Sequence, residues 1–277
     1  MNQNEATAAA GVQYALGHDE HELDRLKTQA RLIDPVTRCF FNEAGIGPGM
    51  RVLDVGCGAG DTSRLFAEMV GEAGEVVGVD RAPAAIAAAR ARAGKMRNLS
   101  FLEGDPSDMN FEQRFDAVVG RYVLMFQENP AEMLRAMALH VRPVGLIAFH
   151  ELNYEGISSS PPLQIFNQVW RWNAETTRLY GANISMGAKL YAAFVTAGLP
   201  PPTLRAEALW GKGSGSVDVL LRTRNLTRSL VSEMARLGVA TREEVGLETL
   251  LERMHEEAVA TGSVVVGPLE VGAWCRV

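Results

Sequence analysis

A glycine-rich stretch follows a short apolar run near the start of the chain. In "VLDVGCGAGDTS", which spans 52–63, glycine stands at every second position of the turn, at Gly56, Gly58 and Gly60. These residues carry no Cβ atom, so a ligand can approach the backbone closely there. The helix predicted after the turn adds unpaired N–H groups and the positive end of its dipole. We therefore expect the turn to bind an anionic group, either a phosphate or a carboxylate.

Two acidic residues follow the next two apolar runs. Asp80 ends "VVGVD", and Asp105 follows "FLEG". An acidic residue that ends a second strand can accept hydrogen bonds from both hydroxyls of a ribose. Asp105 could accept one from an exocyclic amine such as that of adenine, with Pro106 at the edge of the ring and Arg81 over its face. Each aspartate alone also suits a helix start, but together they predict a nucleoside ligand.

The spacing of the glycines separates two kinds of nucleoside ligand. Dinucleotide-binding turns follow GxGxxG, whose third glycine lets the helix pack closely on the strand. Here the spacing is GxGxG, and Asp61 occupies the place of that third glycine. An acidic side chain disfavours a pyrophosphate but tolerates a ligand with a cationic sulfur or ammonium. Asp54, inside the preceding run, suits either an ordering role beneath the turn or a ligand contact.

Strand-like and helix-like runs alternate through the first half of the chain. The strand-like runs are rich in Val, Ile, Leu and Phe with little polar alternation, which is typical of parallel strands covered on both faces. This alternation predicts an α/β fold with a Rossmann-like, doubly wound sheet. The expected strands are 51–55, 75–80, 99–103, 115–120 and 144–150, and the expected helices are 62–70, 83–93 and 130–141.

The second half of the chain predicts further strands among helical insertions. "PPTLRAEALWG" and "SVVVGPLEVGAWCRV" bring the mostly parallel sheet to seven strands, and the insertions form a helical cap. We expect a single domain over 1–277, with N-terminal helices in 1–45 that separate at Asp34 and Pro35. Its parts are the cofactor-binding core 46–151, the cap insertions 152–190 and 211–260, and the remaining core elements 191–210 and 261–277.

Five short motifs resemble those of a known enzyme family. "VLDVGCGAG", "VVGVDRAP", "LEGDP", "FDAVVGRYVLMF" and "VRPVGLIAFHE" look like the successive motifs of class I S-adenosylmethionine-dependent methyltransferases. Small-molecule enzymes of the ubiquinone- and menaquinone-biosynthesis branch, and their relatives in secondary metabolism, look most similar. The resemblance covers residues 45–151 well. The ends "YALGHDEHELDRL" and "GPLEVGAWCRV" also look like this branch, whereas the helical insertions match only in kind.

The resemblance implies where S-adenosylmethionine would lie. The three glycines would hold its methionine part, Asp80 its ribose, and Asp105 the edge of its adenine. The other residues implied are Pro106 and Arg81 beside the adenine, Arg121 through its backbone at the methionine end, and Tyr14 and Gln29 closing over the cofactor.

Three side chains are candidates for a catalytic base: His150 and Glu151 at the end of the fifth expected strand, and Tyr122 after the fourth. A base would take a proton from an amine or alcohol acceptor, whereas a carboxylate or an acidic phenol needs none. His150 and Glu151 also suit a structural role in orienting a loop. "GRYVLMF" departs from the "(D/N)PP(Y/F)" motif of many methyltransferases that act on nucleobase or glutamine nitrogens. No metal is expected, because no His, Asp or Glu set has metal-site spacing.

The composition limits partners and compartment. The net charge is −6 and no basic run stands out, so we expect no DNA partner. The three cysteines form no CxxC pair, which disfavours a disulfide framework or a zinc site. No apolar run is long enough to span a membrane and no signal-peptide pattern opens the sequence, so we expect a cytoplasmic protein. The insertion helices offer apolar faces suited to a homodimer.

The sequence therefore predicts a methyltransferase that moves a methyl group in line from S-adenosylmethionine to an O, N or C atom of a small molecule. Two other classes stay open. One is a protein that binds the cofactor on this fold without methyl transfer, such as a cyclase or a ligand sensor. The other is an NAD-dependent oxidoreductase, which the GxGxG spacing and Asp105 oppose.

Overall fold

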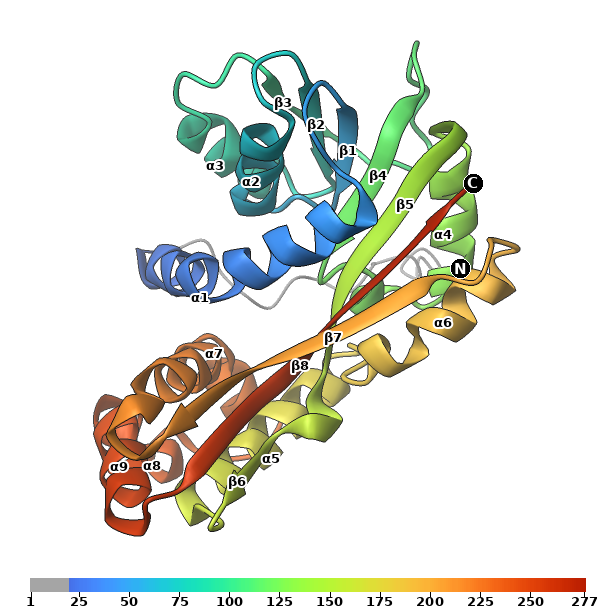
Figure 1. The fold of residues 1–277 in the computed structure, drawn as a ribbon. Helices are drawn as coiled ribbons and strands as arrows, with labels where there is room; N and C mark the ends of the chain where they lie inside the picture. Colours follow the sequence, from blue (N-terminus) through green and yellow to red (C-terminus); the bar gives the residue numbers. More distant parts are fainter. Residues whose placement is uncertain (1–19) are drawn as a thin grey trace, which may run out of the picture.

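The computed structural model describes residues 20–277, with side chains from residue 32 onward. A sheet of eight strands runs through it in the order β3-β2-β1-β4-β5-β8-β6, and β7 pairs with β8 (Figure 1). The strands are β1 (Arg51–Val55), β2 (Glu75–Asp80), β3 (Leu99–Glu103), β4 (Phe115–Arg121), β5 (Val141–Asn153), β6 (Ser158–Ser160), β7 (Thr203–Lys212) and β8 (Val264–Arg276). The helices are α1 (Glu20–Ala44), α2 (Asp61–Val70), α3 (Pro83–Arg92), α4 (Pro130–Ala138), α5 (Gln164–Leu179), α6 (Met186–Thr196), α7 (Val217–Arg236), α8 (Arg242–Val245) and α9 (Leu247–Thr261).

The first five strands are parallel and covered on both faces. β1 pairs with β2 and β4, and these pair with β3 and β5 in turn, all in parallel. Successive side chains of a strand point to opposite faces. Val52 accordingly packs in a cluster with Phe66 of α2, whereas Leu53 packs in a second cluster with Leu134 of α4. The predicted α/β, doubly wound fold is therefore confirmed.

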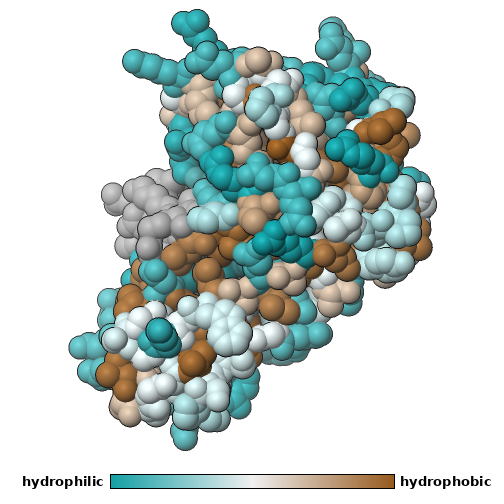
Figure 2. Space-filling view, in the orientation of Figure 1, coloured by the Kyte–Doolittle hydropathy of each residue, from teal (hydrophilic) through white to brown (hydrophobic). Residues whose placement is uncertain are grey.

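β8 extends the sheet and supports a lobe of helices. Its C-terminal half pairs antiparallel with β5, from Leu146↔Arg276 to Asn153↔Leu269, while β7 pairs along its other edge. The short β6 pairs with the N-terminal end of β8, beyond the end of β5. The resulting ribbon carries the lobe of α5, α7, α8 and α9, which lies apart from the lobe of α2 and α3 (Figure 1). Apolar residues gather on the visible face in the region between the two lobes (Figure 2).

Two expectations about the elements are wrong. The sheet has eight strands rather than seven, because three serines within the expected cap insertion 152–190 form β6. α1 is one helix that continues through Pro35, not two helices that separate there. Proline removes only one backbone donor, and Ile33 and Phe40 on either side are both buried in the protein. Asp34, expected as a cap, instead pairs with Arg121.

The boundaries between α4 and β5 also differ from the prediction. α4 ends at Ala138, and β5 begins at Val141 and continues to Asn153. The register between β4 and β5 shifts between the pairs Phe115↔Val141 and Ala117↔Leu146. Because of this irregularity, the apolar pattern of the sequence does not indicate where β5 begins. Within residues 20–277, no helix is both long and apolar enough to cross a membrane.

Candidate functional site

The glycine turn after β1 presents one open backbone position. A Cβ atom at Gly56 would lie 2.8 Å from Cγ2 of Val123, and one at Gly60 would lie 2.7 Å from Cζ of Phe101. These two glycines are therefore needed by the protein's own packing. At Gly58, with φ +54°, a Cβ atom would meet nothing within 4 Å. Gly58 is the position of the turn at which an external group can reach the backbone.

Asp80 lies directly beside this turn, as the sequence predicts. Its Oδ2 accepts a hydrogen bond of 2.9 Å from the N–H of Gly58, and its Oδ1 accepts one of 2.9 Å from the N–H of Ala82. Each carboxylate oxygen can accept a second hydrogen bond. The end of β2 thus holds an oriented carboxylate that retains capacity for two hydroxyl donors.

Asp54 takes the ordering role rather than an exposed one. It is 1% exposed, and its Oδ2 accepts a hydrogen bond of 2.6 Å from the hydroxyl of Ser63 in α2. Burial raises the pKa of this carboxyl to about 7. The contact joins β1 to the helix on the far side of the turn, and so fixes the turn from beneath.

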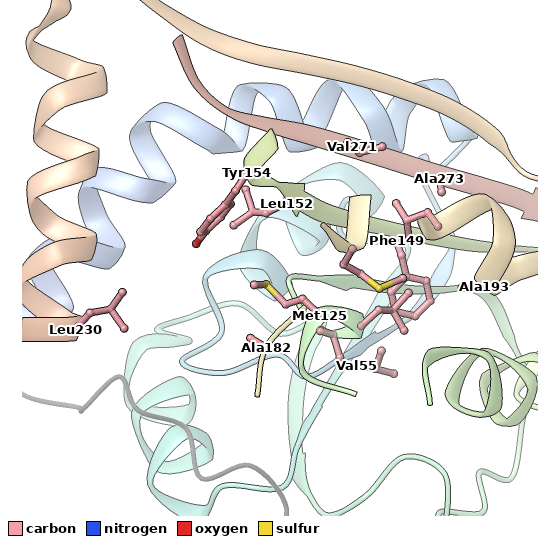
Figure 3. Packing of buried hydrophobic residues seen from close by; sticks show 14 of the residues in the cluster. Val55, Met125, Phe149, Leu152, Tyr154, Ala182, Ala193, Leu230, Val271 and Ala273 are labelled. Atoms are coloured by element: carbon pink, nitrogen blue, oxygen red, sulfur yellow. The ribbon is translucent and has the colours of Figure 1, made fainter. Parts of the chain in front are cut away.

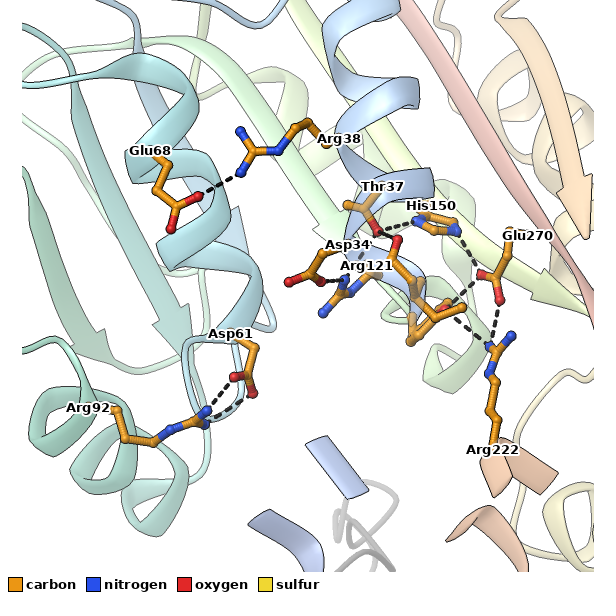
Figure 4. Close-up of polar contacts among 12 residues, drawn as sticks. Asp34, Thr37, Arg38, Asp61, Glu68, Arg92, Arg121, His150, Arg222 and Glu270 are labelled. Carbon is orange, nitrogen blue, oxygen red and sulfur yellow. Dashed lines mark hydrogen bonds and ion pairs between the residues drawn. The ribbon is translucent and has the colours of Figure 1, made fainter. Parts of the chain in front are cut away.

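The acidic residue that distinguishes this turn from a dinucleotide motif is neutralised by an arginine. Both carboxylate oxygens of Asp61 bond the guanidinium of Arg92 in α3 (Figure 4). Arg92 also donates a hydrogen bond of 3.1 Å to the carbonyl of Ala59 within the turn. Asp61 therefore anchors the glycine turn to α3, and its charge is balanced at short range.

Arg81 and Asp105 meet at the ends of β2 and β3. Nη2 of Arg81 lies 2.5 Å from Oδ2 of Asp105, and the other carboxylate oxygen accepts the N–H of Ser107 at 2.9 Å. The ring of Pro106 is buried, and its carbonyl lies 2.8 Å from Nε2 of His140. The structure thus brings Asp80, Arg81 and Asp105 together at one edge of the sheet, as the sequence predicts.

Arg121 is the last residue of β4, and its side chain points toward α1. It is 4% exposed, and Nη1 donates to Asp34 at 2.8 Å and to the hydroxyl of Thr37 at 3.1 Å (Figure 4). The side chain therefore joins the sheet to α1. A cofactor contact through the backbone of Arg121 remains a prediction.

Glu151 is buried at the end of β5 and holds the turn that follows β4. Oε1 accepts the N–H groups of Val123 at 2.8 Å and Leu124 at 2.7 Å, and Oε2 accepts that of Met125 at 3.3 Å. Burial raises the pKa of Glu151 to about 8, although these three N–H donors oppose the shift. The geometry gives this candidate base a structural role.

His150 and Tyr122 both bond a residue that sequence reasoning missed, Glu270 of β8. Nε2 of His150 lies 2.8 Å from Oε2 of Glu270, and the hydroxyl of Tyr122 donates to the same oxygen at 2.7 Å. On the other side of the imidazole, Nδ1 lies 3.2 Å from the hydroxyl of Thr37. Arg222 of α7 completes the group with Nη2 2.5 Å from Oε1 of Glu270 (Figure 4).

This buried group has a defined distribution of charge. Burial alone would raise the pKa of Glu270, but Arg222 and the hydrogen bonds from His150 and Tyr122 outweigh it and lower the pKa to about 2. Burial lowers the pKa of His150, so the imidazole is neutral. An ionised Glu270 can only accept, so Nε2 of His150 carries the ring proton. Burial and the Glu270 carboxylate raise the pKa of Tyr122 well above its ordinary value.

None of the three candidate bases is therefore free in this arrangement. His150 and Glu151 are fully buried, and Tyr122 acts as a donor to Glu270. The one sequence signal for Glu270 is a single acidic residue within the apolar run of β8. Tyr14 lies outside the described residues. Gln29 lies in α1, but its side chain is outside the described part of the structure. Among the residues that the structure describes, no three His, Cys, Asp or Glu side chains form a metal-binding group.

The fold is Rossmann-like and of the class I methyltransferase type. A model of the family described as "Methyltransferase domain" matches residues 46–196, which is more than half of the chain. The chain belongs to this family.

Curated relatives fall among quinone-modifying enzymes. The chain is 34% identical over 136 residues to the 2-phytyl-1,4-naphtoquinone methyltransferase of Thermosynechococcus vestitus, a match that covers 48% of this chain and 59% of that protein. It is 29% identical over 131 residues to the demethylmenaquinone methyltransferase of Staphylococcus aureus, a match that covers 47% of this chain and 52% of that protein. The chain thus spans between half and three fifths of the length of these relatives.

Solved structures share the fold across most of the chain. A cyclopropane-fatty-acyl-phospholipid synthase-like protein from Lactobacillus casei is 19% identical with a TM-score of 0.54, and the match covers 94% of each chain. The phosphoethanolamine N-methyltransferase 2 of Haemonchus contortus, solved with S-adenosyl-L-methionine, is 16% identical with a TM-score of 0.51. That match covers 85% of this chain and 51% of the other. At these identities the comparison supports the fold.

Proposed function

We propose that this protein is an S-adenosylmethionine-dependent methyltransferase that acts on a small molecule. The observation that carries the proposal is the open backbone of Gly58 beside the carboxylate of Asp80. An amino-acid-bearing nucleoside matches this pair, because its polar amino-acid part can approach the bare turn while its ribose hydroxyls donate to Asp80. The family membership of residues 46–196 supports the same ligand.

The residues at the strand ends fit the cofactor. Gly58 would hold the methionine part, Asp80 the ribose, and Asp105 with Arg81 the adenine. Arg81 and Asp105 already form an ion pair, so the adenine amine would share the carboxylate with the guanidinium. When bound, the cofactor supplies a methyl group activated on a cationic sulfur. The remaining role of the protein is to hold the acceptor in line with that group and to exclude water.

The buried group around Glu270 supports an acceptor that needs no strong base. His150, Glu151 and Tyr122 each bond another protein group. An acceptor whose attacking atom is already acidic, or is ionised in solution, reacts without them. We further propose that the acceptor is a small apolar aromatic compound. The demethylmenaquinone and phytylnaphthoquinone methyltransferases among the relatives support this class.

The cap lobe would complete the acceptor pocket above the strand ends. Met125 follows β4 and Tyr154 follows β5, and both extend toward Leu230 of α7 within one cluster of buried residues (Figure 3). Such apolar side chains suit an aromatic acceptor and keep water from the reacting groups. Since α7 and α9 are joined to the core by β7 and β8, and α5 packs on both of these helices, motion of the three helices against the core would admit the acceptor.

Two alternative functions are separable by one set of measurements. Isothermal titration with S-adenosylmethionine, S-adenosylhomocysteine and NAD distinguishes a methyltransferase from an oxidoreductase. We expect both adenosyl compounds to bind and NAD not to bind; tight NAD binding without binding of the other two contradicts the proposal. Transfer of label from [methyl-³H]S-adenosylmethionine to hydroxynaphthalenes then distinguishes catalysis from cofactor binding alone. A cyclase or sensor would bind the cofactor and leave every acceptor unlabelled.

A further inference from the structure

We propose that Arg222 of α7 recognises the acceptor by donating a hydrogen bond from its second guanidinium nitrogen to an oxygen of a hydroxylated aromatic molecule. This inference rests on the methyltransferase function proposed above and names the acceptor chemistry of the same site. Arg222 belongs to the cap, in a region of the chain outside the matched family segment 46–196.

The first observation is an unused donor on a buried cation. Nη2 of Arg222 bonds Glu270, but Nη1 is buried and bonds no atom of the described residues. The side chain is 12% exposed. Leaving a buried polar group without a partner is unfavourable, so such a group in a folded protein generally finds a partner in the protein, an ordered water or a ligand.

The second observation is the position of Arg222 relative to the glycine turn. Val123 packs against Gly56, since a Cβ atom there would lie 2.8 Å from its side chain. Tyr122 precedes Val123, and its hydroxyl lies 3.5 Å from Nη2 of Arg222. Two adjacent residues thus connect the guanidinium to the turn that would hold the methionine part of the cofactor. An acceptor bound by Arg222 would therefore lie near the methionine end of the bound cofactor.

The third observation is a set of further buried polar atoms without a partner in α5 and α7. Asn225 lies one helical turn from Arg222, and Asn173 of α5 donates 2.9 Å across the interface to the hydroxyl of Thr227. The buried side-chain atoms in these two helices that lack a partner in the described structure are Nε1 of Trp170, Oδ1 of Asn173, Oγ1 of Thr176, Oγ1 of Thr177, Nη1 of Arg222 and Oδ1 of Asn225. Both donors and acceptors are unused, which suits a ligand with more than one hydroxyl or carbonyl group.

The chemistry of these groups selects oxygen over a protonated amine. A guanidinium offers only donors, so it donates hydrogen bonds to a carbonyl, phenol or phenolate oxygen and repels an ammonium group. Trp170 also presents a donor, and its ring lies 5.2 Å from that of Tyr154 in an edge-to-face contact. A planar ring bearing oxygens matches this combination of aromatic faces and N–H groups. The guanidinium would stabilise the anion of a phenol bound to its Nη1, whereas the carboxylate of Glu270 on Nη2 opposes part of this effect, so we expect a modest lowering of the pKa of the bound phenol.

The test uses the full chain saturated with S-adenosylhomocysteine, and 1-naphthol as the probe. Calorimetry gives the dissociation constant of 1-naphthol, and its absorbance as a function of pH gives the pKa of the bound phenol. In the wild-type protein we expect a bound pKa below that of free 1-naphthol. We also expect 1-naphthylmethylamine, an ammonium ion at neutral pH, to bind about tenfold more weakly or worse.

Three variants separate recognition from folding. Arg222→Lys keeps a cation beside Glu270 but removes the second arm of the guanidinium, and should weaken 1-naphthol binding about tenfold. The double variant Arg222→Gln with Glu270→Gln removes the buried ion pair as a unit, so it should fold yet show no lowering of the naphthol pKa. Arg224→Gln, two residues further along the same helix, is the matched control and should leave both values unchanged.

The outcomes distinguish this inference from the proposed function. Unchanged naphthol binding in Arg222→Lys overturns the inference, and so does the absence of naphthol binding to a wild-type protein that binds S-adenosylhomocysteine. If the wild-type protein binds neither S-adenosylmethionine nor S-adenosylhomocysteine, the proposed function itself is overturned. Binding of 1-naphthylmethylamine as tight as that of 1-naphthol would likewise exclude Arg222 as the recognising group.

Discussion

The backbone N–H of Gly58 donates a hydrogen bond to Oδ2 of Asp80 across the neighbouring strand ends of β1 and β2, at 2.9 Å. This contact joins the one open glycine of the turn to the carboxylate expected to bind the ribose. The second oxygen is held by the N–H of Ala82. The carboxylate is thus oriented before any ligand arrives, so little conformational entropy is lost when hydroxyl groups bind to it.

Replacing Asp80 should weaken cofactor binding more than it weakens the fold. Asp80→Ala removes the acceptor of the ribose hydroxyls, and we expect S-adenosylhomocysteine binding to weaken by about 1–3 kcal/mol in calorimetry. Glu103→Ala is the control, because Glu103 is exposed at the matching position of the neighbouring strand β3. The assignment of β2 fails if the two variants bind S-adenosylhomocysteine equally well.

Two alanine substitutions in the glycine turn should have different consequences. At Gly58 an added Cβ meets open space, so Gly58→Ala should cost only the left-handed backbone strain of about 1–2 kcal/mol in stability but obstruct the ligand. At Gly60 the Cβ would lie 2.7 Å from Phe101, so Gly60→Ala should add a clash to a similar strain and destabilise the fold further.

Urea unfolding and S-adenosylhomocysteine titration of both variants test this difference. Gly58→Ala should show the larger loss of affinity for each kcal/mol of lost stability. If Gly58→Ala retained wild-type affinity, the turn would not contact the cofactor, and the open position would have another explanation.

The sequence predicts the strand ends well because they depend on local patterns. β1, β2 and β3 have the expected bounds, since each is a short apolar run closed by glycine or aspartate. Asp80 and Asp105 meet at one edge because parallel strands place their carboxyl ends together. By contrast, β6 has three residues and no apolar pattern, and α1 continues through a proline because burial on both sides outweighs one lost hydrogen bond.

The buried polar group could not be predicted in this way. His150 and Glu270 are 120 residues apart in sequence, and Tyr122 is separated from Glu270 by 148. Only the antiparallel pairing of β8 with β5 brings them together, and no local spacing encodes that contact. For the same reason, a histidine and a glutamate at a strand end were interpreted as candidate bases when the structure gives each a buried partner.

The neutral, buried state of His150 predicts a specific pH dependence of stability. Its pKa in the folded protein is below the ordinary value of 6.5. Below that pH the unfolded chain binds a proton that the folded protein does not, so acidification favours unfolding by up to about 1.4 kcal/mol per pH unit. His150→Gln lacks this contribution. The free energy of unfolding of the wild-type protein should therefore fall relative to that of the variant between about pH 6.5 and 5.

Because Glu151 also titrates, the effect of His150 must be measured as the difference between the wild-type and His150→Gln stability curves. The pKa of Glu151, about 8 in the folded protein, lies above the ordinary 4.5, so the folded state binds a proton first as the pH falls. This contribution increases stability on acidification and partly masks that of His150 in the wild-type curve alone. Subtracting the variant curve removes it. His255→Gln, in α9, is the control, and parallel curves for wild-type protein and His150→Gln would mean that folding does not lower the pKa of His150.

The ion pair between Asp61 of α2 and Arg92 should contribute more to stability than the ion pair that Glu68 of the same helix forms. The side chains of Asp61 and Arg92 are 13% and 22% exposed, and Arg92 also bonds the carbonyl of Ala59. We expect Asp61→Asn to destabilise the protein by about 1–2 kcal/mol, because a partly buried guanidinium loses its charged partner. Glu68→Gln breaks the exposed pair with Arg38, which should contribute about 0–0.5 kcal/mol. Urea unfolding at low and high salt measures both, and equal losses that vanish together in salt would show that Asp61 makes only a surface contact rather than anchoring the glycine turn.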